Sequence, residues 1–252
     1  MAGKVYAVMS LVQGNGAKYV STNIARSIKR TYKKEDRRVL LVDFDFENPF
    51  LAYDLIAHDI NHGIDTLVPN IYDSTVGKEI FKENIIQTRI DVDVLRGTKF
   101  PGKIKQYSKS QIEGILKAAK EIYDDIIVVI SCKANNAGTI YTLFHADEVL
   151  LIVRDNYTNY MQFDRVIRTI MMYSRNSKSI LVIYNMQNQY AKSHLNQKVK
   201  DSPIDAEVIA VLEQDERSID NVDLQKKEKL FAGSKNRKSF MDIAKILVGG
   251  AT

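Results

Sequence analysis

Short apolar runs rich in Val and Ile alternate along this chain with longer segments in which apolar residues recur every three or four positions. Runs of that length and composition are typical of buried strands, and the longer segments have the period of helices that cover a sheet. The alternation therefore predicts an α/β fold with a mostly parallel central sheet and helices on both faces. The expected strands are Lys4 to Ser10, Val39 to Asp43, Val92 to Leu95, Ile126 to Ser131, Val149 to Val153, Ser179 to Tyr184 and Glu207 to Val211.

Four helices are expected from the spacing of their apolar residues, which places one buried stripe on each helix. Ser108 or Ser110 is the expected N-cap of the second helix, because a serine hydroxyl accepts a hydrogen bond from a free amide of the first turn. We interpret the stripes as core-facing; they are Val20, Ile24, Ile28 and Tyr32; Ile112, Ile115, Leu116, Ala119 and Ile122; Val166, Ile167, Ile170 and Met171; and Phe240, Ile243, Ala244 and Leu247.

The bulk composition narrows the domain count and the compartment. No stretch rich in Pro, Gly or Ser divides the 252 residues, so we expect a single domain over 1–252. The single cysteine, Cys132, excludes an internal disulfide and favours a reducing, cytoplasmic compartment. No uncharged apolar stretch is long enough to cross a bilayer, and the first apolar run is shorter than a signal peptide requires.

Positive charge is concentrated in two segments, 26–38 and 226–238, although the formal net charge is only +5. Such segments can hold nucleic acid or an anionic membrane surface, and the alternative is a solvated helix face. The candidate residues for an anionic surface are Arg30, Lys33, Lys34, Arg37, Lys226, Lys227, Lys235, Arg237 and Lys238.

A glycine-containing loop separates the first expected strand from the first expected helix. In α/β proteins this position binds phosphates, because the loop amides and the helix N-terminus present positive potential. A dinucleotide-binding motif is disfavoured, since its third glycine is replaced by Tyr19. The candidate nucleotide-binding residues of this loop are Gly14, Asn15, Gly16, Ala17, Lys18 and Tyr19.

The same loop resembles the deviant Walker A motif of the ParA/MinD family, S-x-K-G-G-x-G-K-(S/T)-T followed by A-N-L-A, and aligns with it without a gap from Ser10 to Ala25. Three charged or metal-binding positions of that motif differ here. Val12 replaces the lysine that reaches the partner's phosphates, and Ala17 replaces the lysine that holds the β- and γ-phosphates. Lys18 replaces the hydroxyl that would bind Mg²⁺, and an ammonium there argues against the metal, so no metal site is expected.

Other segments resemble the family's later landmarks. Asp43 and Asp45 match its V-L-L-(I/V)-D-x-D strand, and the resemblance implies that they are catalytic if the protein is active. The strand before Ser131 lacks the Walker B aspartate. Ala146 to Val153 resembles the A-D-E-V-L-L-V-V strand, Asn185 matches the adenine-reading asparagine, and Asp215 matches the aspartate of the late loop.

The resemblance implies a P-loop NTPase-like fold, ATP or ADP as ligand, a homodimer, and a protein partner in a partition, pilus or secretion system, as in the degenerate TadZ/CpaE branch. Because phosphoryl transfer relies on lysine and Mg²⁺, the losses predict a pseudo-ATPase scaffold in which Lys18 pairs with Asp43 or Asp45. The basic segments would attach it to nonspecific DNA at the nucleoid, or to a membrane surface. The alternatives are an active ATPase that uses Lys18 and a plain protein-interaction module.

Overall fold

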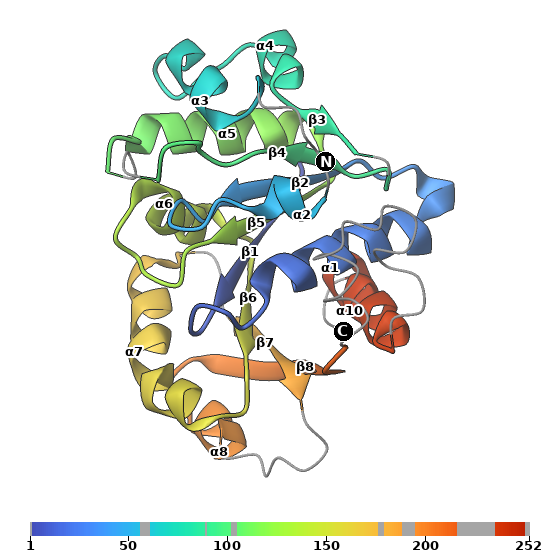
Figure 1. Ribbon diagram of the computed structural model, residues 1–252, viewed down its shortest axis with the longest axis vertical. Coiled ribbons are helices and arrows are strands. Elements are labelled where there is room, and N and C mark those ends of the chain that lie inside the picture. Colours follow the sequence, from blue (N-terminus) through green and yellow to red (C-terminus); the bar gives the residue numbers. More distant parts are fainter. Residues whose placement is uncertain are drawn as a thin grey trace.

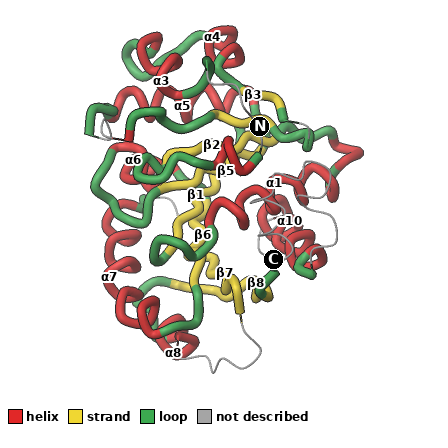
Figure 2. Tube along the Cα trace, in the orientation of Figure 1, coloured by secondary structure: helices red, strands yellow, loops and turns green. Residues whose placement is uncertain are grey.

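The computed structural model describes residues 2–55, 61–88, 90–101, 105–175, 179–187, 195–215 and 235–249. Its strands form one sheet in the order β3-β4-β2-β5-β1-β6-β7-β8, the central layer of Figures 1 and 2. Neighbouring strands are parallel except β3 and β4, which pair antiparallel. The strands are β1 Lys4–Ser10, β2 Val39–Phe44, β3 Ile86–Gln87, β4 Asp93–Leu95, β5 Asp125–Ile130, β6 Glu148–Val153, β7 Ser179–Gln187 and β8 Asp205–Glu213.

Helices cover both faces of the sheet. The helices are α1 Ala17–Thr31, α2 Leu51–Asp54, α3 Ile64–Leu67, α4 Lys78–Glu83, α5 Lys109–Ile122, α6 Ala137–His145, α7 Tyr157–Tyr173, α8 Leu195–Lys200 and α10 Arg237–Gly249, with 3-10 turns η1 Lys33–Glu35 and η2 Val68–Asn70. In Figure 1, α5, α6 and α7 lie on one side of the sheet, and α1 and α10 pack side by side on the other. Along β1, Val5, Ala7 and Met9 face the first group of helices, whereas Tyr6 and Val8 face the second. The α/β fold predicted from the sequence is therefore confirmed.

The predicted elements agree with the structure to within two residues at almost every end. β1 has the expected bounds, and the four expected helices are α1, α5, α7 and α10. Ser108 is the N-cap of α5, where its hydroxyl accepts from the amide of Gln111 in a capping box. The sequence reasoning missed β3 and the short helices α2, α3, α4, α6 and α8. No helix in the described ranges is long and apolar enough to span a membrane.

Candidate functional site

The loop between β1 and α1 lies at the carboxyl edge of the sheet. Gly14 and Gly16 have φ of 89° and 91°, and Gly16 is the left-handed N-cap of α1. A Cβ at Gly16 would lie 2.4 Å from Nδ2 of Asn185, so glycine is required there for space as well as for φ. The loop therefore has the compact, glycine-dependent shape expected of a phosphate-binding loop.

A buried network of asparagines holds this loop against the neighbouring strands. Nδ2 of Asn15 donates to the carbonyl of Ile152 at 3.1 Å and to Oδ1 of Asn159 at 2.7 Å. Nδ2 of Asn185 donates to the main-chain carbonyl of Asn15 at 2.8 Å. Asn159 also donates to Asn156, the N-cap of α7. Because these amides satisfy one another away from water, they fix the loop to β6, β7 and α7.

A cleft of about 290 Å³ opens beside the loop. Its lining is Ser10, Gln13, Gly14, Gly16, Ala17, Lys18, Asp45, Asn48, Ile130 and Cys132. The structure thus brings together five of the residues predicted for the site, four from the loop and Asp45 from the segment after β2. It also places the thiol of Cys132 there, where burial raises the pKa of the thiol, so a nucleophilic role gains no support.

An ion pair closes the polar side of the cleft. Nζ of Lys18 lies 3.0 Å from Oδ2 of Asp45, and both side chains are less than one fifth exposed. The other oxygen of Asp45 accepts from the hydroxyl of Ser131 at 3.0 Å. Across the mouth, Nε2 of Gln13 donates to Oδ1 of Asn48 at 3.2 Å. The pairing predicted between Lys18 and one of the two aspartates is present, and Asp45 is the partner.

Asp43 lies beneath this pair and is buried. Its carboxylate accepts from the amides of Asp45 at 3.2 Å and Leu51 at 3.0 Å. Burial raises the pKa of Asp43 to about 7 from its ordinary value of 3.8, although Lys18 and the two amides oppose the shift. Asp43 therefore changes charge near neutral pH, one layer below the cleft.

This raised pKa makes stability depend on pH. Between about pH 4 and pH 7 native Asp43 keeps a proton that the unfolded chain has lost, so this residue's contribution to stability falls as pH rises and is constant above about pH 7. We expect Asp43→Asn to cost most stability near pH 5 and a few kcal/mol less near pH 8. Urea unfolding across that range measures the difference, and a cost independent of pH would contradict the assignment.

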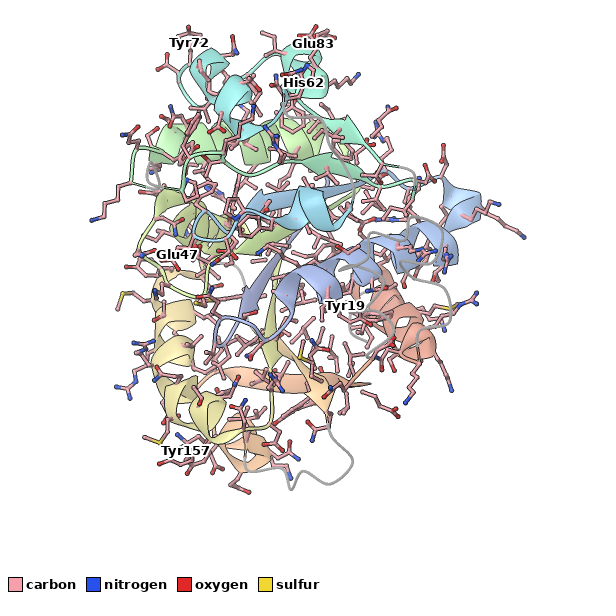
Figure 3. All side chains as sticks on the ribbon, viewed as in Figure 1. Tyr19, Glu47, His62, Tyr72, Glu83 and Tyr157 are labelled. Atoms are coloured by element: carbon pink, nitrogen blue, oxygen red, sulfur yellow. The ribbon has the colours of Figure 1, made fainter. Side chains whose placement is uncertain are left out.

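The remaining predicted nucleotide-binding residues lie away from the cleft lining. Asn15 and Asn185 belong to the buried network. Tyr19 turns toward α10, where its ring packs edge-on against Phe240 at 5.8 Å (Figure 3). Asp215 is half-buried just after β8.

The described part of the second basic segment, 235–238, meets the first segment where α10 packs against α1. Packing of α1 against α10 brings Arg26 near Arg30 and Arg237, and burial together with these two charges lowers the pKa of Arg26 to about 10. Arg30 and Arg237 are exposed, as are Lys33, Lys34, Lys235 and Lys238 of the same two segments. Arg37 instead forms a two-point ion pair with buried Asp125. Lys226 and Lys227 lie outside the described residues.

The lining of the cleft does not fit a magnesium nucleotide. Among the described residues that line it, Lys18 is the cation and Asp45 the anion, so the lining carries no net positive charge for a triphosphate. Within the described ranges no three His, Cys, Asp or Glu side chains are grouped as metal ligands. Phosphate sites need cationic or metal partners for the phosphate oxygens, and this closed arrangement does not fit that requirement.

The loop, the helix after it and the cleft at the carboxyl edge of a parallel sheet are the features of a P-loop NTPase-like α/β fold. Within that type, the fold is that of the ParA and MinD ATPases. The structure is similar to a ParA family ATPase from Chlorobium tepidum, with a TM-score of 0.80 and 18% identity over 96% of this chain and 99% of that one.

Two further solved structures are similar along nearly their whole length. One is the septum site-determining protein MinD from Pyrococcus horikoshii with Mg-ADP, at a TM-score of 0.71 and 18% identity over 97% of this chain and 96% of that one. The other is a putative plasmid partition protein from Borrelia burgdorferi bound to AMPPNP. Its TM-score is 0.68, with 15% identity over 99% of this chain and 100% of that one. Identities this low establish the fold. The sequence matches no protein-family model and no curated protein.

Several residues of the site were missed from the sequence. Ser131 follows the strand that ends in the Walker B aspartate in the ParA/MinD motif, and its hydroxyl donates to Asp45. Asn156 and Asn159 follow β6 with the spacing of an N-cap and the amide from which it accepts, and this spacing is a sequence signal for the start of α7. Gln13 and Asn48 are polar loop residues that lie far apart in the sequence. The sequence alone therefore gives no sign of their contact.

Proposed function

We propose that this protein is a degenerate relative of the ParA and MinD ATPases that acts as a dimeric scaffold positioning a partition, pilus or secretion assembly, in the manner of the TadZ/CpaE branch, without hydrolysing ATP. The observation that carries the proposal is the ion pair between Lys18 and Asp45. It uses the cation of the cleft lining to neutralise a carboxylate of the same site. The charge that would hold a phosphate is therefore already satisfied.

The neighbouring positions support the same conclusion. Val12 and Ala17 supply no charge to the loop, and Ser131 supplies a hydroxyl where phosphoryl transfer uses a metal-binding carboxylate. Losing one preorganised group of this kind costs about 10²-fold to 10³-fold in rate. Several such losses together keep the fold and remove the groups needed for ATP hydrolysis.

Isothermal titration with ATP and Mg²⁺ tests the proposal. We expect no saturable binding below about 1 mM, because the phosphates would have to displace Asp45 from Lys18 without gaining a second cation. Asp45→Ala is the informative variant, since it removes the competing carboxylate and leaves Lys18 in the cleft. Micromolar binding of Mg-ATP to the unaltered protein would overturn the proposal.

A second candidate is a slow ATPase that uses Lys18 in place of the missing loop lysine. One observation favours it: Lys18 lies in the second position of α1 and lines the cleft. Phosphate release in the presence of Mg-ATP separates the two candidates. Release that is abolished by Lys18→Met and changed by Asp45→Ala would favour the ATPase, and no release above background favours the scaffold.

We propose that the basic face of α1 and α10 attaches the scaffold to nonspecific DNA in the cytoplasm. Exposed Arg30 and Arg237 lie on two helices that pack together, so both can approach phosphates of one duplex. We expect Arg30→Ala and Arg237→Ala each to weaken binding and to lower the slope of log affinity against log salt by about 1. Lys117→Ala, an exposed change on α5, is the control.

Fluorescence anisotropy with duplexes of unrelated sequence measures these slopes. Equal losses for Lys117→Ala would contradict attachment through this face. Affinity that does not change with salt would contradict DNA attachment altogether and favour a plain protein-interaction module.

A further inference from the structure

Large apolar side chains are exposed among the charged residues on the outward face of α7, where a surface helix is normally polar. Tyr157, Met161 and Met172 are 74%, 55% and 73% exposed. With Arg168 they follow one another at intervals of four, seven and four residues, which places all four within about 60° around the helix axis. The opposite face, with Phe163, Val166 and Ile170, is buried in the core. We call the exposed set Tyr157, Met161, Arg168 and Met172 the α7 stripe.

The α7 stripe has the composition of a protein-binding surface. Tyr, Met and Arg are enriched at interfaces, where aromatic and Arg side chains contribute much of the binding energy. The stripe runs for about 22 Å, which is the length of four turns of a partner helix. A stripe of this kind on a well-packed helix offers a preformed surface that loses little entropy on binding.

A depression continues the surface at the N-terminal end of α7. Tyr157 and Tyr160 stack with their ring centroids 6.4 Å apart, and Nζ of Lys198 from α8 lies 4.3 Å above the ring of Tyr160. Together with Gln197 and Asp201 these residues line a hollow of about 710 Å³. Tyr157 projects beside α8 in Figure 3. The hollow has room for an anchoring side chain next to the stripe.

The charges around the α7 stripe select the partner. Arg165 and Arg168 are exposed on the same face. Asp164, which precedes Arg165, is already paired with Lys198 at 2.7 Å, so the face carries a net positive charge. A second copy docked through this stripe would bring arginines against arginines, which is unfavourable. An acidic partner gains from the same charges, since complementary potentials favour association.

We propose that the α7 stripe is the docking surface for an acidic helical segment of another protein, with apolar side chains that pack on Met161 and Met172 and carboxylates that pair with Arg165 and Arg168. The charge and apolar residues of this surface specify the chemistry of the protein partner. The proposal rests on the scaffold role proposed above. The surface lies outside the cleft and needs no nucleotide.

The test uses a synthetic peptide of about 18 residues with Leu along one helical face and Glu beside it. Fluorescence anisotropy with the full-length protein is expected to give a Kd of about 1–100 μM. Arg168→Glu and Met172→Glu should each weaken binding at least about 10-fold, since each removes an anchor of the interface. Replacing Glu by Lys in the peptide, or Leu by Ser, should abolish binding.

Two matched variants control for general effects of an added negative charge. Tyr157→Glu is paired with Tyr72→Glu, because Tyr72 is 73% exposed and lies at the opposite end of the molecule (Figure 3). Arg168→Glu is paired with Lys117→Glu on α5. Within each pair only the α7 variant should lose affinity for the peptide, and circular dichroism should show every variant, Met172→Glu included, to be folded.

The proposal is overturned if the Glu peptide does not bind, if the Lys peptide binds equally, or if the control variants lose as much affinity. It is also overturned if phosphatidylglycerol vesicles, and not the peptide, bind in a way that depends on Arg168 and Met172. The result is separable from the scaffold proposal. Micromolar ATP binding with normal peptide binding would overturn the nucleotide-free scaffold and leave the docking surface standing.

Discussion

Replacing Asp125 by Ala is expected to lower the free energy of unfolding by about 3–5 kcal/mol, because it leaves a cation in a largely buried position without its partner. Asp125 is fully buried at the start of β5. Arg37 donates to both of its oxygens, at 2.7 and 3.0 Å, and this hydrogen bonding raises the pKa of the guanidinium. Tyr6 donates to the same carboxylate at 3.3 Å and to the carbonyl of Leu247 in α10 at 3.0 Å.

The adjacent residue provides the control. Asp124 faces Arg38 at 3.8 Å, and both side chains are more than a third exposed. Exposed pairs contribute about 1 kcal/mol or less, so Asp124→Ala should cost far less than Asp125→Ala. Urea unfolding of both variants at one pH measures the difference. Equal costs would show that the buried pair does not hold the N-terminal edge of the sheet to α10.

The strands were predictable because their sequence carries the physical cause of their burial. In a parallel sheet covered on both faces, every residue of β2 or β5 is buried, and the runs Val39 to Asp43 and Ile126 to Ser131 therefore read as continuous apolar segments. The alternation of these strands with helices predicts a parallel sheet, since parallel strands need long crossover connections and helices usually form them. The capped start of α5 at Ser108 was predictable for a local reason: cap and amide are three residues apart.

Most of the missed elements are too short to show periodicity in their sequences. β3 has two residues, and α3 and α4 have four and six, which is less than two helical turns. A segment that short shows no repeat of its apolar face. The turn before β4 also contains Asp91 at φ of 61°. A positive φ is uncommon in a non-glycine residue, so the sequence does not predict this conformation.

The candidate site was predictable where residues are consecutive and not where distant segments meet. Lys18 was predicted to pair with Asp43 or Asp45 because the resemblance placed all three at one site, and the structure shows that Asp45 is the partner. The asparagine network joins Asn15 to Asn159 and Asn185 across 144 and 170 positions. Asn15 and Asn185 were predicted as nucleotide-binding residues, but nothing in the sequence indicates that they are joined to each other or to Asn159. The same holds for the basic face, which only the packing of α1 on α10 assembles.

Restoring the cation of the loop is expected to create nucleotide binding. The variant Ala17→Lys with Lys18→Thr places an ammonium where the related motif has one and a hydroxyl where it binds Mg²⁺. It also removes the ion pair, so Asp45 is left facing the cleft. Ala17 lines the cleft and is 8% exposed, so the new side chain enters a space next to the loop amides.

We expect Mg-ATP affinity to rise at least about 100-fold, to a Kd of tens of micromolar, because a lysine in a partly desolvated site interacts strongly with the β- and γ-phosphates. The matched control is Ala17→Met with Lys18→Thr, which opens the cleft in the same way and adds no charge. Isothermal titration of both variants separates charge from space. If the Met variant binds ATP as well as the Lys variant, then Lys18 and Asp45 exclude the nucleotide by blocking the cleft. If only the Lys variant binds, the missing charge is the cause, and the loop has kept the shape of a phosphate site after losing its charge.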